Sequence, residues 1–269
     1  MSVKIGAHVE SVDPIVEATA RGADLVQIFL GDPQGWKDPA VSYAGGPEAL
    51  RGALAAAGLD LYIHAPYRLN VATSNNRIRI PSRQLLAKYA AAAADLGARA
   101  IVVHGGHVLR TDDPEGGLDN WAKTFERWDP PLPVLIENTA GGDGAIARRL
   151  DRIARLWEVF ADRLAPAVLD KVGFVLDTCH AHAGGEELAG IVDRVKAATG
   201  RVDLVHANDS RDAFDSGADR HTNLGQGQVD ADALVALVTA AGAPVVCETP
   251  GGAEGQGADI AWLRQRLPA

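Results

Sequence analysis

The sequence has few cysteines and no long apolar run, and both absences exclude classes of protein. Its 269 residues include two cysteines, Cys179 and Cys247, and no CxxC pair, so a disulfide framework is excluded and two reduced, buried thiols are expected. No run approaches the roughly 20 apolar residues that a membrane helix needs. The opening MSVKIGAHVE lacks an apolar signal core. We therefore expect a cytoplasmic protein that is neither secreted nor inserted in a membrane.

Internal repeats, low-complexity tracts and an obvious interdomain linker are also missing. Hydrophobic residues make up 47% of the chain and charged residues 23%, which is the balance of a folded globular protein. Division by a typical domain size would give about two domains, but α/β barrels often reach roughly 250 residues as one domain. We therefore predict a single domain over residues 1–269.

Short β-rich runs recur along the chain, and most are apolar at first and polar at the end. Such runs are typical of parallel strands that are covered on both faces. The runs are Val3–Val9, Leu25–Leu30, Leu61–Pro66, Ala100–Gly105, Val134–Thr139, Gly173–Cys179, Leu204–Asn208 and Val245–Thr249.

Segments with helical spacing of apolar residues separate these runs. The clearest is Ser82–Leu96, for which Ser82 is the expected N-cap and Gly97 the C-terminal stop. Asp230–Ala241 and Ala258–Leu267 are predicted as helices on similar grounds. The glycine-rich segments 141–144 and 251–257 are interpreted as mobile loops.

Eight strand–helix units in alternation predict a parallel sheet, and their number favours closure into a (β/α)₈ TIM barrel. An open doubly wound sheet is the alternative. No GxGxxG motif follows the first predicted strand, which removes the usual dinucleotide-binding version of that fold.

Histidines and carboxylates gather where the predicted strands end, and no histidine falls in a predicted helix. Four carboxylates share this placement, with Glu137 in IENT, Asp177 in LDTCH, Asp219 in DRH and Glu248 in CET. In a barrel, all strand ends converge on one rim, where such enzymes carry their chemistry. The histidines are His8, His64, His104, His107, His180, His182, His206 and His221.

Imidazole nitrogen and carboxylate oxygen are ligands that suit zinc and similar divalent ions. A single histidine at a strand end is more often a hydrogen-bonded structural residue than a ligand. Four carboxylates at one rim, however, would repel one another at a cost of several kcal/mol in a low-dielectric site. The sequence therefore predicts a metal site at the carboxyl-terminal face of the barrel.

Local spacing refines this prediction. In an extended loop, Asp219 and His221 point to the same side and can share one ion. Asp177 and His180 could serve one ion or two adjacent ones. We expect Cys179 to be a buried neutral thiol and His8 to have a packed structural role. His107 and His182 are interpreted as solvent-exposed or as supports for the ligands.

Charge is distributed unevenly along the chain. The net charge is −9, which by itself argues against a polyanionic partner. Residues 61–94 nevertheless contain no acidic residue, and they form a basic segment that is either a chance run on a solvated face or a local binding surface. Its cations are Arg68, Arg77, Arg79, Arg83 and Lys88.

Taken together, these segments resemble the endonuclease IV family, the zinc-dependent abasic-site endonucleases of family 2. The resemblance covers most of the chain, and the joint occurrence of LDTCH, an ND segment and DRH is highly specific. The matching segments are IGAHV (5–9), VQIF (26–29), IHAPY (63–67), VHGGH (103–107), IENTAG (136–141), LDTCHAHAGG (176–185), HANDS (206–210), DRHTNLGQG (219–227) and CET (247–249).

The resemblance implies three zinc ions on a (β/α)₈ barrel. By position, His64, His104 and Glu137 correspond to ligands of the first zinc. Glu137 would bridge to a second zinc, which is also held by Asp177, His206 and Glu248. The third zinc site would be formed by His180, Asp219 and His221. Manganese is an alternative to zinc at one of the sites, because both metals accept these ligands.

The resemblance also implies a function in base excision repair of DNA. The expected reaction is hydrolysis of the phosphodiester 5′ to an abasic site in duplex DNA, which leaves a 3′-hydroxyl and a 5′-deoxyribose phosphate. The expected partner is double-stranded DNA with abasic sites. We expect a monomer, since the DNA-binding rim must stay accessible.

The DNA-contact positions depart from the family pattern in places. Tyr67 matches a family residue that enters the DNA, whereas Gln34 stands where an arginine is common and Arg68 where a leucine is common. Trp36, which could also simply pack its loop, is a further candidate for the DNA surface. Arg77 and Arg79 of the basic segment are expected to contact phosphates.

Two other functions are compatible with parts of the sequence. A sugar isomerase or epimerase on a related barrel, with one or two divalent ions, would explain the fold, Glu137, Asp177 and His206. It would not explain the set of His180, Asp219 and His221, or the basic segment. A non-catalytic metal-binding or DNA-binding barrel is the second alternative, against which the complete ligand set argues.

Overall fold

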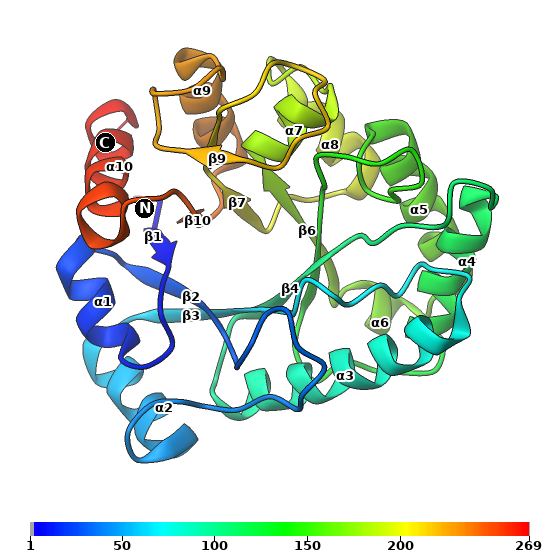
Figure 1. The fold of residues 1–269 in the computed structure, drawn as a ribbon, viewed down its shortest axis with the longest axis horizontal. Helices are drawn as coiled ribbons and strands as arrows, with labels where there is room; N and C mark the ends of the chain where they lie inside the picture. Colours follow the sequence, from blue (N-terminus) through cyan, green and yellow to red (C-terminus); the bar gives the residue numbers. More distant parts are fainter. Residues whose placement is uncertain (1–2, 269) are drawn as a thin grey trace.

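The computed structural model describes residues 3–268. Eight parallel strands close into a barrel in the order β1-β10-β7-β6-β5-β4-β3-β2, with helices around the outside (Figure 1), which confirms the predicted TIM barrel. The barrel strands are β1 (Ile5–His8), β2 (Leu25–Phe29), β3 (Asp60–His64), β4 (Ala100–His104), β5 (Val134–Glu137), β6 (Val172–Asp177), β7 (Leu204–His206) and β10 (Val245–Cys247).

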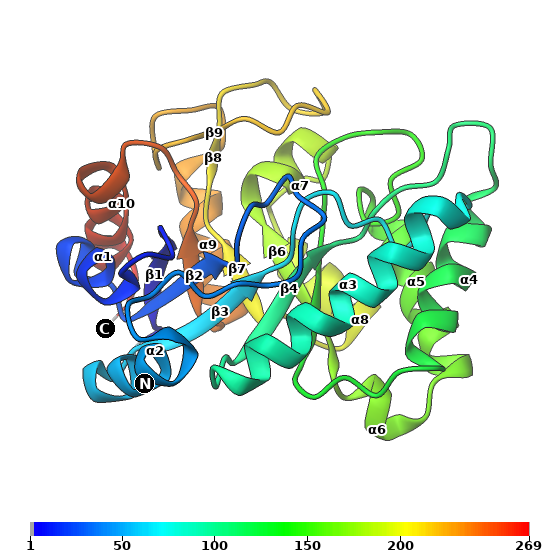
Figure 2. The same ribbon diagram turned by 60° about the horizontal axis from the view of Figure 1, so that its bottom comes forward.

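One helix or more follows each barrel strand. The helices are α1 (Pro14–Arg21), α2 (Gly46–Ala57), α3 (Asn76–Asp95), α4 (Pro114–Phe125), α5 (Leu150–Arg163), α6 (Pro166–Leu169), α7 (Thr178–Gly184), α8 (Ile191–Thr199), α9 (Ala231–Ala241) and α10 (Gly252–Arg266). A short antiparallel pair, β8 (Asp209–Ser210) and β9 (His221–Thr222), follows β7. Figure 2 shows this pair with its long loop above α7, at one end of the barrel.

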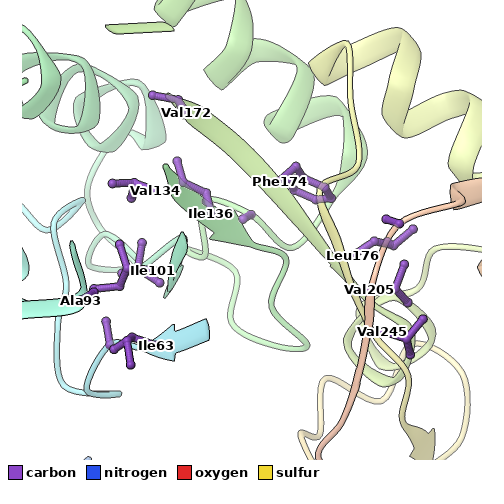
Figure 3. Packing of buried hydrophobic residues seen from close by; sticks show 14 of the residues in the cluster. Ile63, Ala93, Ile101, Val134, Ile136, Val172, Phe174, Leu176, Val205 and Val245 are labelled. Atoms are coloured by element: carbon purple, nitrogen blue, oxygen red, sulfur yellow. The ribbon is translucent and has the colours of Figure 1, made fainter. Parts of the chain in front are cut away.

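The barrel strands are apolar on both faces, and each face packs against a different partner. Outward-facing residues such as Ile63, Ile101 and Phe174 pack with the surrounding helices (Figure 3). Inward-facing residues fill the barrel itself as a separate cluster. Because successive side chains of a strand alternate between the two faces, the sequence shows nearly continuous apolar runs. The inward cluster comprises Leu25, Tyr62, Ala100, Val102, Leu135, Val175, Leu204 and Val246.

The inward cluster depends on one glycine. A Cβ atom at Gly173 of β6 would lie 2.5 Å from Cδ2 of Leu135 and 2.4 Å from a carboxylate oxygen of Asp203. A side chain at that position would force both of these groups to shift. The glycine therefore leaves room inside the barrel for Leu135, whose side chain is 2% exposed.

The prediction of the third helix was wrong at its start. Helix α3 begins at Asn76, not at Ser82, and Asn75 is its N-cap, accepting a hydrogen bond from the backbone N–H of Arg77. Pro81 lies inside the helix, where it removes one helical hydrogen bond and does not end the helix. The hydroxyl of Ser82 instead accepts a bond from the backbone of Asn70, 3.0 Å away.

The last helix also begins earlier than predicted. Residues 252–257, expected to belong to a mobile loop, form the first turns of α10. Glycine lowers helix propensity by about 1 kcal/mol relative to alanine, which is why the sequence favoured a loop. The glycines have a packing reason, because a Cβ at Gly255 would lie 2.4 Å from the carbonyl oxygen of Pro250. Among residues 3–268, no helix combines the length and apolar character needed to cross a membrane.

Candidate metal centre

A layer of polar side chains lies directly above the apolar interior of the barrel. Each of these polar residues comes two positions after an inward-facing apolar residue. Because successive side chains of a strand alternate between its two faces, both side chains point into the barrel. Hydrogen bonds and ion pairs join all of these polar side chains into one group. We call this group the polar layer, and it consists of Gln27, His64, His104, Glu137, Asp177, His206 and Glu248.

The first cluster is formed by His64, His104 and Glu137, at the ends of β3, β4 and β5. Oxygen Oε2 of Glu137 lies 3.2 Å from Nε2 of His64 and 3.4 Å from Nε2 of His104. One donor atom of each residue lies within 4.8 Å of the others, close enough to hold one metal ion. His104 is the most accessible of the three, with 22% of its side chain exposed.

The second cluster contains Glu137, Asp177, His206 and Glu248. Nδ1 of His206 lies 3.0 Å from Oε1 of Glu137 and 3.3 Å from Oε2 of Glu248. It is also 3.9 Å from Oδ2 of Asp177. The two oxygens of Glu137 thus face different clusters, Oε2 the first and Oε1 the second, which is the arrangement a bridging carboxylate requires.

The third cluster is formed by His180, Asp219 and His221. Oδ1 of Asp219 lies 3.1 Å from Nε2 of His180 and 3.2 Å from Nε2 of His221. His221 stands on β9, and the expectation that Asp219 and His221 point to the same side agrees with this geometry. His180 lies in helix α7, not in a loop, because Asp177 caps that helix by accepting from the backbone N–H of His180 at 2.7 Å.

The free nitrogens of these histidines test whether a metal fits. Nε2 of His180 and Nε2 of His221 are buried, and their close approaches to Oδ1 of Asp219 lack hydrogen-bond geometry, so neither nitrogen has a hydrogen-bond partner within residues 3–268. On the other side of each ring, Nδ1 faces a backbone carbonyl oxygen, that of Asn138 at 2.9 Å or of Glu248 at 3.3 Å. A carbonyl oxygen only accepts, so in the neutral ring Nδ1 carries the proton and Nε2 presents a lone pair. Such a buried lone pair suits a metal ion.

Electrostatics in the metal-free centre follow from burial and from mutual contacts. Burial would raise the pKa of Glu137, but the imidazoles of His206 and His104 hold it well below its usual range. Despite burial, the neighbouring carboxylates raise the pKa of His180 and His206 well above the ordinary value. Burial raises the pKa of Asp177. The centre thus compensates its buried carboxylates with histidine protons, a role that a bound cation can take over.

Cys179 lies next to these side chains and belongs to a fourth possible group, with Asp177 and His221. Metals bind the thiolate form of cysteine. Burial raises the pKa of Cys179 to about 12, in agreement with the buried neutral thiol that the sequence predicts.

Comparison with known proteins assigns the family. The family model described as "xylose isomerase-like TIM barrel" matches residues 15–266. A protein of Mycobacterium tuberculosis H37Ra named "Probable endonuclease 4" is 55% identical over 262 residues, which are 97% of this chain and 98% of that protein. The chain belongs to the endonuclease IV family. It is therefore an enzyme of the endonuclease class of hydrolases.

Solved structures agree with this assignment. Endonuclease IV from Thermus thermophilus superimposes with a TM-score of 0.81 and 30% sequence identity, over 97% of this chain and 98% of that one. A D-tagatose 3-epimerase-like protein gives a TM-score of 0.77 at 18% identity, over 98% of this chain and 96% of that one. The second likeness concerns the fold alone.

Sequence reasoning missed two polar residues that support the endonuclease IV centre. The amide of Asn208 donates to Oδ2 of Asp177 at 2.7 Å, and its oxygen accepts from the backbone of Glu248 at 2.8 Å. Gln27 donates to Oε1 of Glu248 at 2.6 Å. Both residues stand in segments that carry the resemblance, but amides offer no metal-ligand signal by residue type.

Three histidines outside the candidate ligand set are also placed. His8 packs against Phe29 with 4.3 Å between ring centroids, in agreement with the expected packed role, and its Nδ1 also lies 3.2 Å from Oε1 of Glu248. Nε2 of His182 lies 3.1 Å from the carbonyl oxygen of Asp212. The side chain of His107 is exposed. The position of His107 agrees with the sequence-based interpretation, whereas His182 is half-buried and contacts no candidate ligand.

Tyr67 and Arg68 are exposed in the loop after β3. A cavity of about 550 Å³ is lined by these two residues together with His104 and the glycine-rich segment 141–144. The Tyr67 ring lies 5.6 Å from the His104 ring, centroid to centroid. This cavity opens directly beside the first cluster.

Trp36 and Gln34 lie in the loop after β2, and Arg77 and Arg79 lie in the first turn of α3. Trp36 is 41% exposed and lines a cavity of about 460 Å³ together with Arg77. Gln34 is also exposed. The guanidinium of Arg79 is less available to bind a phosphate, because it donates to the carbonyl oxygens of Thr73 at 3.0 Å and Ser74 at 3.3 Å.

The two remaining cations of the basic segment, Lys88 and Arg83, have partners within the protein. Lys88 forms an ion pair with Asp38 at 2.6 Å, and Arg83 donates to the carbonyl oxygen of Asn120. Of these two cations, only Lys88 has its charge balanced by a carboxylate, whereas Arg83 keeps its charge and is held against the backbone of α4.

Two ion pairs anchor the loop that carries Asp219. Oδ1 of Asp215 accepts from Arg148 at 2.9 Å and from Arg149 at 2.7 Å. Asp215 has a φ of 60°, an uncommon conformation for a residue other than glycine. These ion pairs therefore fix the loop that brings Asp219 to the third cluster.

Proposed function

We propose that this protein is a zinc-dependent endonuclease of base excision repair that acts in the cytoplasm. It would hydrolyse the phosphodiester 5′ to an abasic site in duplex DNA and leave a 3′-hydroxyl and a 5′-deoxyribose phosphate. The observation that carries this proposal is three clusters of potential ligand atoms, of which the first and second share the two oxygens of Glu137. Membership of the endonuclease IV family and the likeness to the Thermus enzyme support it.

Three zinc ions fit the donor set, with manganese an alternative at one position. His64 and His104 would hold the first with Glu137. Asp177, His206 and Glu248 would hold the second with Glu137. His180, Asp219 and His221 would hold the third. When bound, the ions supply hydroxide at neutral pH and neutralise the phosphate and the departing oxygen.

The protein's own residues hold this centre rigid and shape access to it. Glu137 is fully buried, and its bridging position would set the spacing of two ions. Three divalent cations would more than neutralise the four carboxylates, so that an acidic chain need not repel DNA at the reacting phosphate. Arg68 and Arg77, exposed beside the two cavities, would contact flanking phosphates.

Recognition of the abasic site would depend on how easily damaged DNA is deformed. A duplex that lacks a base bends at low cost and can extrude its sugar–phosphate. The cavity beside His104, with Tyr67 and Arg68 at its wall, is placed to receive that unit. Undamaged nucleotides would be excluded by size. Trp36 and Gln34 would contact the neighbouring DNA, and the protein would act as a monomer.

The test is incubation with a duplex that carries one abasic analogue, with and without a chelator, alongside a metal count per chain. The proposal predicts three metals and nicking 5′ to the analogue that the chelator abolishes and added zinc restores. An intact duplex of the same sequence is the matched control and should not be cut. One or two metals with turnover of a ketosugar would overturn the proposal in favour of an epimerase.

A further inference from the structure

Gln27 occupies an unusual position for an uncharged residue. It lies on β2, is fully buried and belongs to the polar layer, although amides are not among the usual ligands of zinc. Its Nε2 lies 2.6 Å from Oε1 of Glu248 and 3.0 Å from Nδ1 of His8. Its Oε1 lies 3.1 Å from Nε2 of His206. Gln27 thus contacts two candidate ligands of the second cluster from outside it.

The orientation of this amide follows from its neighbours. The carboxylate of Glu248 can only accept hydrogen bonds, so the group facing it at 2.6 Å is the NH₂ of Gln27. The amide oxygen then faces His206 and requires a proton on Nε2 of that ring. The lone pair of a neutral His206 is therefore on Nδ1, which lies among the oxygens of Glu137, Glu248 and Asp177.

His206 differs in this respect from three other histidines of the centre. His64, His180 and His221 each turn Nδ1 to a backbone carbonyl oxygen and present Nε2 to the cluster. No side-chain substitution removes those carbonyl acceptors. For His206 the ring is reversed, and the acceptor that fixes it is the side chain of Gln27.

We propose that Gln27 is a positioning residue that fixes His206 in the Nε2–H form and orients Glu248, so that both present ligand atoms to one ion. This inference rests on the proposed function, because it concerns the second of the three metal positions. Residues that orient a ligand in this way typically contribute 10- to 100-fold in metal affinity. Gln27 would act through His206 and Glu248 without touching metal or DNA.

Two variants separate the two contacts. Gln27→Met keeps the length of the side chain and removes both hydrogen bonds. Gln27→Glu keeps an acceptor for His206 but places an oxygen against Glu248. Zinc affinity, measured by competition with a chromophoric chelator, should fall about 10- to 100-fold for one ion in both variants, with the other two ions retained. Ile28→Val, a change at the outward-facing neighbour, is the control and should leave all three affinities unchanged.

The ring form of His206 is measured directly on the zinc-loaded wild-type protein. A long-range proton–nitrogen NMR spectrum of protein labelled with ¹⁵N-histidine, with His206 assigned through His206→Asn, should show a proton on Nε2 and none on Nδ1. This measurement does not depend on whether either Gln27 variant folds. Gln27→Glu should keep this pattern.

The outcomes distinguish this inference from the proposed function. A proton on Nδ1 of His206, or unchanged zinc affinity in a folded Gln27→Met variant, would overturn the role of Gln27 while leaving the metal centre in place. Absence of zinc binding and of nicking in the wild-type protein would instead overturn the proposed function, and this inference with it.

Discussion

The interior of the barrel has two adjacent layers that are both largely buried and opposite in character. The lower layer is apolar, with residues such as Leu135 and Val175, and the upper is the polar layer, with Glu137 and Asp177 two positions later on the same strands. Burial of each large apolar side chain stabilises the fold by about 1.5–3 kcal/mol. Burial of an ionised group without a partner costs far more. The same strands therefore stabilise the protein at one level and carry its chemistry at the next.

This difference explains why the polar layer needs rigid support. Its carboxylates are compensated by imidazoles, by the amides of Asn208 and Gln27, and in our proposal by metal ions. Packing of the lower layer holds the strand ends in register, so that side chains distant in the sequence meet within hydrogen-bonding distance. A substitution in the polar layer should therefore lower metal affinity, and a substitution in the apolar layer should lower the free energy of unfolding.

The largest effect is expected for Glu137→Gln. Loss of the bridging carboxylate should disturb two metal positions at once, so that more than one zinc equivalent is lost. Nicking of abasic DNA should fall by more than about 100-fold, the upper range for residues that only orient ligands. Metal analysis and single-turnover nicking measure both quantities. Retention of all three ions with near-normal nicking would contradict the bridging role.

The matched change in the lower layer is Leu135→Ala, two residues earlier on β5. It should lower the free energy of unfolding by about 2–5 kcal/mol, because it leaves a cavity inside the barrel. Metal content and nicking at 25 °C should remain close to normal while the protein is folded. Urea unfolding monitored by circular dichroism gives the free energy. If Leu135→Ala lost zinc while keeping its stability, the division between the two layers would be wrong.

Arg77 lies outside both layers, and its substitution should affect neither stability nor metal content. Arg77→Glu, alone or with Arg79→Glu, should weaken binding to abasic DNA and flatten its salt dependence, by about one unit of slope for each phosphate that is no longer neutralised. The single variant is cleaner, because Arg79 also holds the backbone at Thr73 and Ser74.

Arg127 provides a charge-matched control for this prediction. It is exposed just after the C-terminus of α4, at the opposite end of the barrel. Arg127→Glu should therefore leave affinity and salt slope unchanged. Equal losses in Arg77→Glu and Arg127→Glu would indicate a general effect of net charge, and unchanged binding in Arg77→Glu would remove the basic segment from the DNA surface.

The smallest effect is expected for Asp215→Asn. Exposed ion pairs contribute about 0.2–1 kcal/mol, so loosening the loop that carries Asp219 should weaken zinc binding at the third cluster by no more than about fivefold. Asparagine tolerates the positive φ of this position, so the backbone should be preserved. Asp38→Asn, which removes another exposed ion pair, is the control and should have no effect. A loss at the first cluster instead would contradict the assignment of the loop.

Much of the fold could be predicted from the sequence, because parallel strands buried on both faces leave distinct apolar runs. The eight runs coincide with the barrel strands to within about two residues at each end. The starts of α3 and α10 could not be predicted, since Pro81 and Gly255 oppose a helix by propensity and tertiary packing outweighs that preference.

The candidate site divides in a similar way. Residue type and position after a predicted strand indicated nine candidate ligands, and the family resemblance divided them among three ions; the structure brings them into the three corresponding groups. Gln27 and Asn208 carry no such mark, because their role depends on which atoms face them. The contacts of Lys88 and Arg83 could not be predicted either, because their partners Asp38 and Asn120 are distant in the sequence.

The most direct test of the central claim is diffraction from crystals grown with zinc, recorded at the zinc absorption edge. The account predicts three anomalous peaks: one between His64, His104 and Glu137; one between Glu137, Asp177, His206 and Glu248; and one between His180, Asp219 and His221. An anomalous map without peaks among these side chains would contradict the account.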